Sequence, residues 1–113
     1  MSAKQADPEF IVFDTPEMGI RALAKVLLNY RRKHGLKTVR GIIGRWAPPN
    51  ENDTLAYAKA VAKALGVTVD QPIDMEDRDV MQTLVTAIIR HENGEQPYSH
   101  GTIRDAIALA FEP

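Results

Sequence analysis

A single glutamate at the end of an apolar helix is the residue best placed for chemistry. Glu92 follows the apolar run at 87–89 and precedes Asn93 and Gly94, a pair that ends helices. The helix dipole disfavours an anion at this end, so a partly buried carboxyl group there holds its proton to higher pH. A general acid that works near neutral pH needs this property. The competing interpretation is an exposed glutamate without a special role.

The second candidate stretch surrounds the only tryptophan. Trp46 is followed by Ala47, two prolines and then five polar residues at positions 50–54. Flat apolar faces beside amide and carboxylate groups suit a sugar ring, which predicts a groove bordered by Trp46, Asn50 and Asn52. Local chemistry alone favours a different interpretation, in which the prolines stop a helix, the polar residues cap the next one, and Trp46 fills the core.

A basic cluster, residues 31–34 with Lys37 and Arg40 nearby, is the third candidate. Such side chains can contact phosphates. Cations are also expected at the C-terminal end of a helix from its dipole alone, and the formal net charge of the chain is −1. We therefore interpret the cluster as a solvated helix end and do not expect nucleic acid as a partner.

These candidates must be positioned by helices, because the start and stop signals along the chain are helical. Thr15, Pro16 and Glu17 are the cap, first residue and first-turn anion of a helix that Gly35 ends. Four further helices are predicted by apolar residues at three- and four-residue spacing. They run from Thr38 to Trp46, from a cap at Asn52 or Asp53 to Leu65, from the anions at 74–77 to Gly94 with His91 on the apolar face, and from Ser99 to Ala110.

The sequence thus predicts an all-α fold, a compact bundle of about five helices. Residues 1–9 are expected to be a flexible N-terminal segment and residues 10–113 a single helical domain. There are no cysteines, and the three histidines are too scattered for a zinc motif, so we expect neither a metal site nor a cofactor. No stretch approaches the roughly 18 apolar residues of a membrane span, and the polar start predicts no signal peptide.

The chain from Phe10 to the last helix resembles a family of small phage and prophage proteins described as virion or structural proteins. The matching stretches are residues 13–23, 28–30, 38–43, 46–54 with Tyr57, and 87–94 with 96–98. This resemblance implies a protein made in the bacterial host cytoplasm and carried in the virion, with other virion proteins as partners and a homo-oligomer as one arrangement.

Two parts of the chain also resemble lysozyme-like peptidoglycan hydrolases. Residues 13–17 look like the start of their helical lobe, and residues 87–94 look like the lytic transglycosylase signature, with Asn93 where the signature has serine. The resemblance implies that Glu92 is the general acid/base, that Trp46, Asn50, Asn52 and Tyr98 bind the substrate, and that the fold is a lysozyme-like helical lobe.

Two functions of different classes remain open at this point. The first is a peptidoglycan glycosidase or lytic transglycosylase. A hydrolase needs a second carboxylate about 5–5.5 Å away for retention or 6.5–9.5 Å for inversion, and Glu51 or Asp53 would supply it. The second is a non-enzymatic phage structural or assembly protein that has lost catalysis. It is suggested by the lack, before Phe10, of an asparagine-rich segment that related phage proteins carry.

Overall fold

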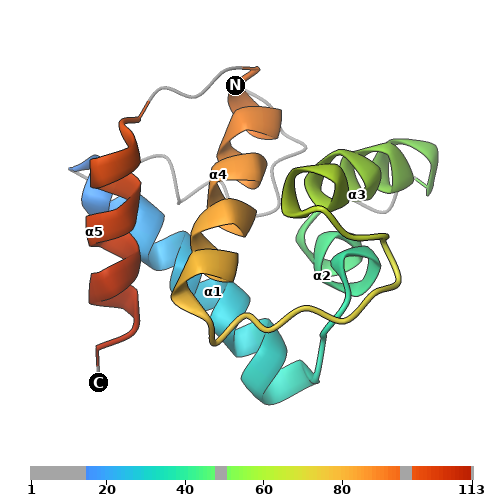
Figure 1. The fold of residues 1–113 in the computed structure, drawn as a ribbon, viewed down its shortest axis with the longest axis horizontal. Helices are drawn as coiled ribbons and strands as arrows, with labels where there is room; N and C mark the ends of the chain where they lie inside the picture. The colour runs from blue at the N-terminus through green and yellow to red at the C-terminus, as the bar shows by residue number, and fades with distance from the viewer. Residues whose placement is uncertain (1–14, 48–50, 95–97, 113) are drawn as a thin grey trace.

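The computed structural model describes residues 15–47, 51–94 and 98–112, except for the side chains of residues 51 and 52. Within these ranges the chain forms five α-helices, which confirms the predicted all-α fold (Figure 1). They are α1 (Pro16–His34), α2 (Val39–Trp46), α3 (Glu51–Leu65), α4 (Arg78–Asn93) and α5 (His100–Ala110). The described residues contain no β-strand, and their single β-bridge joins Thr38 to Pro72. Residues 1–9, which the sequence predicts to be a flexible segment, lie outside them.

Most helix ends are where the sequence signals predict them. Thr15, Thr38 and Ser99 each accept a hydrogen bond from a backbone N–H in the first turn of their helix. Gly35, Gly66 and Gly94 all have positive φ angles, which glycine adopts without a steric penalty. The predicted cap of the third helix is wrong. Because α3 begins at Glu51, Asn52 and Asp53 lie inside its first turn and neither precedes it as a cap.

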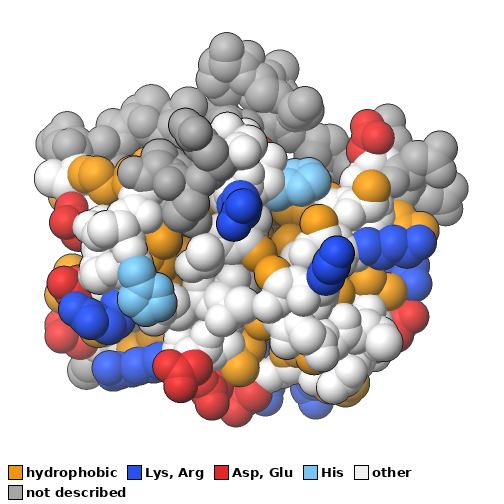
Figure 2. All heavy atoms as spheres, turned by 45° about the horizontal axis from the view of Figure 1, so that its top comes forward, with side chains coloured by type: hydrophobic (Ala, Val, Ile, Leu, Met, Phe, Trp, Pro, Cys, Tyr) orange, Lys and Arg blue, Asp and Glu red, His pale blue; other side chains and the backbone are white. Residues whose placement is uncertain are grey.

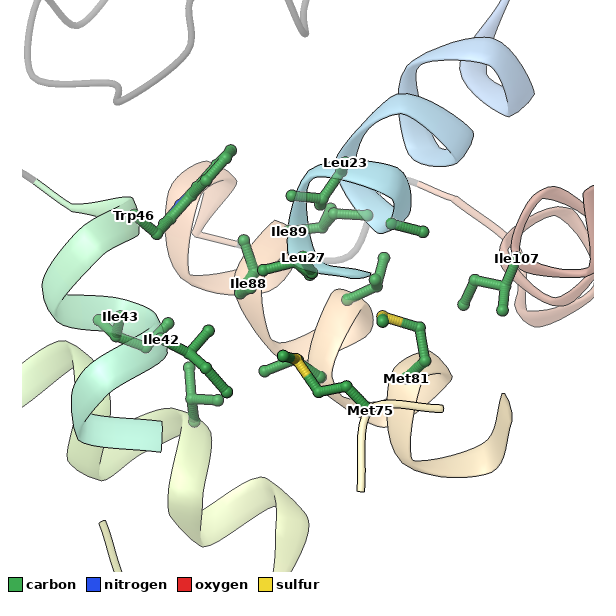
Figure 3. Close-up of a cluster of buried hydrophobic side chains, with 14 of the residues drawn as sticks. Leu23, Leu27, Ile42, Ile43, Trp46, Met75, Met81, Ile88, Ile89 and Ile107 are labelled. Atoms are coloured by element: carbon green, nitrogen blue, oxygen red, sulfur yellow. The ribbon is translucent and has the colours of Figure 1, made fainter. Parts of the chain in front are cut away.

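Helix α4 lies in the middle of the fold. It packs against α3 on one side and α5 on the other, and α1 contacts both α4 and α5 (Figure 1). Its buried side chains are Met81, Leu84, Val85, Ile88 and Ile89. They join residues of every other helix in one apolar core, part of which Figure 3 shows. The last turn of α4, which carries Glu92, is therefore the end of a helix that packs against three others.

The connection between α3 and α4, residues 66–77, runs across the start of α2. The backbone N–H of Arg40 donates to the carbonyl of Val69 at 2.9 Å, and that of Ile73 donates to the carbonyl of Lys37 at 2.7 Å. The first of these bonds satisfies an N–H of the first turn of α2, which has no partner within its own helix. The side chain of Met75, fully buried, anchors the connection to the core.

None of the helices in the described ranges is both long enough and apolar enough to cross a lipid bilayer.

The central place of α4 leads to a stability prediction. Leu84 is completely buried, so Leu84→Ala should lower the free energy of unfolding by about 2–5 kcal/mol through the lost burial and the cavity it leaves. The matched control is Leu109→Ala on α5, where the side chain is 42% exposed and the change should stay within about 0.5 kcal/mol. Urea unfolding followed by circular dichroism measures both. Equal effects of the two substitutions would contradict this assignment of the core.

Candidate functional site

The candidate site is formed where the last turn of α4 meets the middle of α3. The hydroxyl of Tyr57 on α3 donates a hydrogen bond to Oε2 of Glu92 on α4, with 2.9 Å between the two oxygens. Glu92 is half-buried, and no described residue bonds to its other oxygen, Oε1. The carboxyl group is thus fixed in orientation through one oxygen, while its second oxygen is left for another partner.

The neighbouring residue on α4, His91, contacts the same tyrosine in another way. Its imidazole stacks on the ring of Tyr57, with the ring centroids 3.7 Å apart and the planes 19° from parallel. The sequence pattern placed His91 on the apolar face of the helix, and this prediction is wrong, because the residue is exposed. Position 91 is on nearly the same side of the helix as Ile88, but the buried stretch of α4 ends at Ile89, and residues 90–93 of the last turn are exposed or half-buried.

Burial controls the chemistry of Tyr57. The residue is 5% exposed, and this burial is the main reason why the pKa of the Tyr57 hydroxyl lies far above its usual value. The charge of Glu92 and the hydrogen bond to it raise the pKa further. Tyr57 therefore keeps its proton over the whole physiological range and acts as a permanent hydrogen-bond donor to Glu92.

Trp46, the last residue of α2, also lies close to the Tyr57 hydroxyl. Its indole N–H opposes the effects above and lowers the pKa of Tyr57, although less than they raise it. The contact is weak, since the indole nitrogen has no hydrogen-bond partner of normal geometry among the described residues. The tryptophan and glutamate stretches, 46 residues apart in numbering, therefore meet at one hydroxyl group.

Trp46 itself is 3% exposed and belongs to the apolar core, at the edge of the cluster in Figure 3. Its flat face is covered, so the ring does not provide the open sugar platform that one interpretation of the sequence required. The core-filling interpretation describes its position.

The structure describes two of the remaining predicted site residues, Asp53 and Tyr98. Asp53 is exposed on the first turn of α3, four residues before Tyr57 and therefore on the same side of the helix. Tyr98 is half-buried against the core. Asn50 and the side chains of Glu51 and Asn52 lie outside the described part of the structure. The structure thus brings Trp46 and Glu92 together and puts Asp53 on the face of α3 that bears Tyr57.

The basic cluster has a role within the fold. Arg32 donates two hydrogen bonds to Glu76, both 2.8 Å long, and Arg40 donates two to Asp70, 2.7 and 3.2 Å long. These hydrogen bonds hold the pKa of both carboxyl groups below the usual value. Such exposed pairs stabilise a protein only slightly. They nevertheless give Arg32 and Arg40 a role in holding the α3–α4 connection. The presence of these two arginines therefore does not require a phosphate ligand.

Charges of both signs occur together on the face drawn in Figure 2. On the face in Figure 2, cationic and anionic side chains are mixed around the lower edge, and hydrophobic side chains form small separate areas. Among the described residues, no group of three or more histidine, aspartate or glutamate side chains could hold a metal ion.

Tyr57 is the site residue that sequence reasoning underestimated. It lies beside the apolar stripe formed by Ala58, Val61 and Ala62 on α3. At such a position the sequence pattern predicts that a tyrosine is a core residue and has no role in a site. A signal was present, because a buried phenol needs a polar partner for its hydroxyl group, and the number of such partners in an apolar core is small. Chemically, the arrangement is one carboxyl group held by a neutral donor beside an exposed imidazole.

Comparison with known proteins relates the chain to a phage protein. It is 40% identical over 105 residues to Protein P5 of Pseudoalteromonas phage PM2, and the match covers 93% of this chain. The chain spans 64% of the length of Protein P5, just under two thirds. Identity at this level over nearly the whole chain indicates common ancestry. No family model matches the sequence.

The environment of Tyr57 predicts how the protein responds to alkali. The folded state holds the Tyr57 proton more tightly than the unfolded state, where the hydroxyl ionises near the usual value of 10.0. Stability conferred by the neutral tyrosine is thus present below that pH and is lost as the pH rises above it. Chemical unfolding at several alkaline pH values should show a smaller loss of stability for Tyr57→Phe than for wild type.

Ultraviolet titration of phenolate absorbance tests the same environment directly. The difference between wild type and Tyr57→Phe isolates Tyr57, which should ionise well above 10.0 in the folded protein. Glu92→Gln should lower this midpoint, because the carboxylate charge that opposes the phenolate is gone. Ionisation of Tyr57 near 10.0 in the folded protein would contradict the hydrogen-bonded, buried placement.

Proposed function

We propose that this protein is a virion-associated phage or prophage protein whose Tyr57–Glu92 site acts on the glycan strands of bacterial peptidoglycan. The first part is supported by the common ancestry with Protein P5 of phage PM2 and by the resemblance to small phage virion proteins. The second part is supported by one observation above all, the half-buried carboxyl group of Glu92 held by the hydroxyl of Tyr57.

The proposed role of Glu92 is protonation of the glycosidic oxygen. Since Oε2 accepts the Tyr57 hydrogen bond, the proton of the neutral carboxyl group resides on Oε1, the oxygen that no described residue occupies. From Oε1 it passes to the glycosidic oxygen as the bond from that oxygen to the sugar C1 breaks. The oxygen leaves as a hydroxyl group, and Glu92 becomes a carboxylate to which Tyr57 still donates.

The carboxylate then acts as the base of the second step. In a lytic transglycosylase it takes the proton of a hydroxyl group of the substrate itself, whose oxygen attacks C1 and closes an anhydro ring. In a hydrolase the attacking oxygen comes from water, and a second carboxylate assists. Asp53, on the Tyr57 side of α3, is the described candidate for that group, with Glu51 as the other. The chemistry of the product decides between the two reactions.

A second function, a non-enzymatic structural or assembly protein, is favoured by the burial of Trp46. With 3% of this residue exposed, the tryptophan stretch contributes to the core and offers no sugar-binding face. On this proposal the hydrogen bond between Tyr57 and Glu92 joins α3 to α4 and has no reaction to perform. The partners would be other virion proteins or further copies of the chain.

Digestion of purified peptidoglycan distinguishes the two functions. The wild-type protein should release anhydro or reducing-end muropeptides, which mass spectrometry identifies, and Glu92→Gln should release at least a hundredfold less, as expected for loss of a general acid. The matched control is Glu112→Gln, an exposed glutamate beyond α5, which should digest as wild type does. If neither wild type nor control releases products while circular dichroism shows both folded, the enzymatic proposal is wrong.

The structural function makes a prediction of its own. A tagged copy of the chain, expressed in cells that produce the phage carrying this gene, should sediment with the particles through a density gradient. In solution, an assembly protein should form a stable oligomer or complex that buries more than about 1,000 Å². A strictly monomeric chain in analytical ultracentrifugation that never sediments with particles would exclude a virion role of either kind.

A further inference from the structure

The exposed aromatic surface beside Glu92 is provided by His91, and this bears on how a glycan would be held. A site for sugar rings normally presents a flat ring to the apolar C–H face of the sugar. Trp46 and Tyr57 are 3% and 5% exposed, so both rings are covered. His91 is exposed, and its ring lies flat on Tyr57.

The stack fixes the imidazole in position and leaves one of its faces outward. With the centroids 3.7 Å apart and the planes 19° from parallel, one face of the His91 ring is in contact with Tyr57. The opposite face points away from Tyr57. Because Tyr57 is itself buried, the stack restrains the His91 ring, and less side-chain entropy is lost when a ligand packs on the outer face.

Glu92 is held by the same tyrosine, so the two groups have a fixed relation. The ring of Tyr57 contacts His91, and the hydroxyl of Tyr57 contacts Glu92, the next residue on α4. His91 is therefore an exposed ring held by the same tyrosine that holds Glu92.

We infer that His91, stacked on Tyr57, is the sugar-binding platform of this site and packs its outer face against an N-acetylhexosamine ring of the glycan strand. The inference rests on the proposed action on peptidoglycan and assigns to His91 the role that the sequence suggested for Trp46. His91 is a binding residue on this view, and Glu92 remains the reacting group.

Binding measured separately from cleavage tests the inference. Glu92→Gln, which retains an oxygen to accept the Tyr57 hydrogen bond, is titrated with a tetramer of β-1,4-linked N-acetylglucosamine while NMR records the ring protons of its three histidines. The signals of His91 should shift saturably and those of His100, on α5, should not. This readout needs no substitution at His91 and therefore does not depend on how well a His91 variant folds.

Substitutions then identify the stacking contribution. In the same Glu92→Gln background, His91→Ala should raise the Kd about tenfold, the size expected for a lost ring contact, and His91→Phe should keep it near the starting value. His100→Ala is the control and should have no effect. A Kd that is unchanged by His91→Ala, or ring signals of His91 that do not move, overturns the inference.

The failures of the two proposals are distinguishable. If wild type digests peptidoglycan but His91→Ala binds the tetramer normally, only the platform is wrong and the cleavage reaction stands. If wild type neither digests peptidoglycan nor binds the tetramer, both the platform and the proposed action on glycans are wrong. Loss of binding in His91→Phe together with His91→Ala would show that the imidazole acts through hydrogen bonds, which also overturns the stacking role.

Discussion

Burial of α4 on several sides is the constraint on which the rest of the structure depends. Helices α1, α3 and α5 all pack against α4, and α2 reaches the same core through α3 and through Trp46. Five of its sixteen residues are fully buried, and the stretch that carries most of them, residues 82–89, contains no charged side chain. Its ionisable side chains are confined to the first and last turns, where solvent and the neighbouring helices can satisfy them.

The site is a consequence of this confinement. Glu92 lies in the last turn of α4, where the core stops and a carboxyl group can be half-covered without being isolated. The partner that satisfies it is itself a buried group with the same requirement, the hydroxyl of Tyr57. Tyr57 supplies the hydrogen-bond donor and Glu92 the acceptor, so each satisfies the polar group of the other. One hydrogen bond thus serves packing between α3 and α4 and also aims the carboxyl group.

The hydrogen bond between Tyr57 and Glu92 is compatible with two evolutionary histories of the protein. In an active glycosidase the pair would keep one carboxyl oxygen occupied and the other available, with His91 as the ring for the sugar. In a structural protein descended from such an enzyme, the pair would persist because removal of either member leaves a buried polar group unpaired. Common ancestry with Protein P5 fits both histories.

Local sequence determined the helices and their ends. Thr15, Thr38, Ser99 and the glycines at 35, 66 and 94 act within one turn of their own position, so their effect can be read without knowing the fold. The failure at the start of α3 has the same origin. Residues 50–53 contain several adequate caps in a row, and local chemistry does not choose among neighbours of similar quality.

Tertiary structure alone decided which residues meet. The spacing of Trp46, Tyr57 and Glu92 along the chain carries no information on their distance, because that distance depends on how α2, α3 and α4 cross. The packing buried Trp46, exposed His91 and gave Tyr57 a partner 35 positions away. The sequence by itself determined that Glu92 would stand at the end of an apolar helix. Which side chain would hold it depended on the helix packing that excludes water from one face of α3.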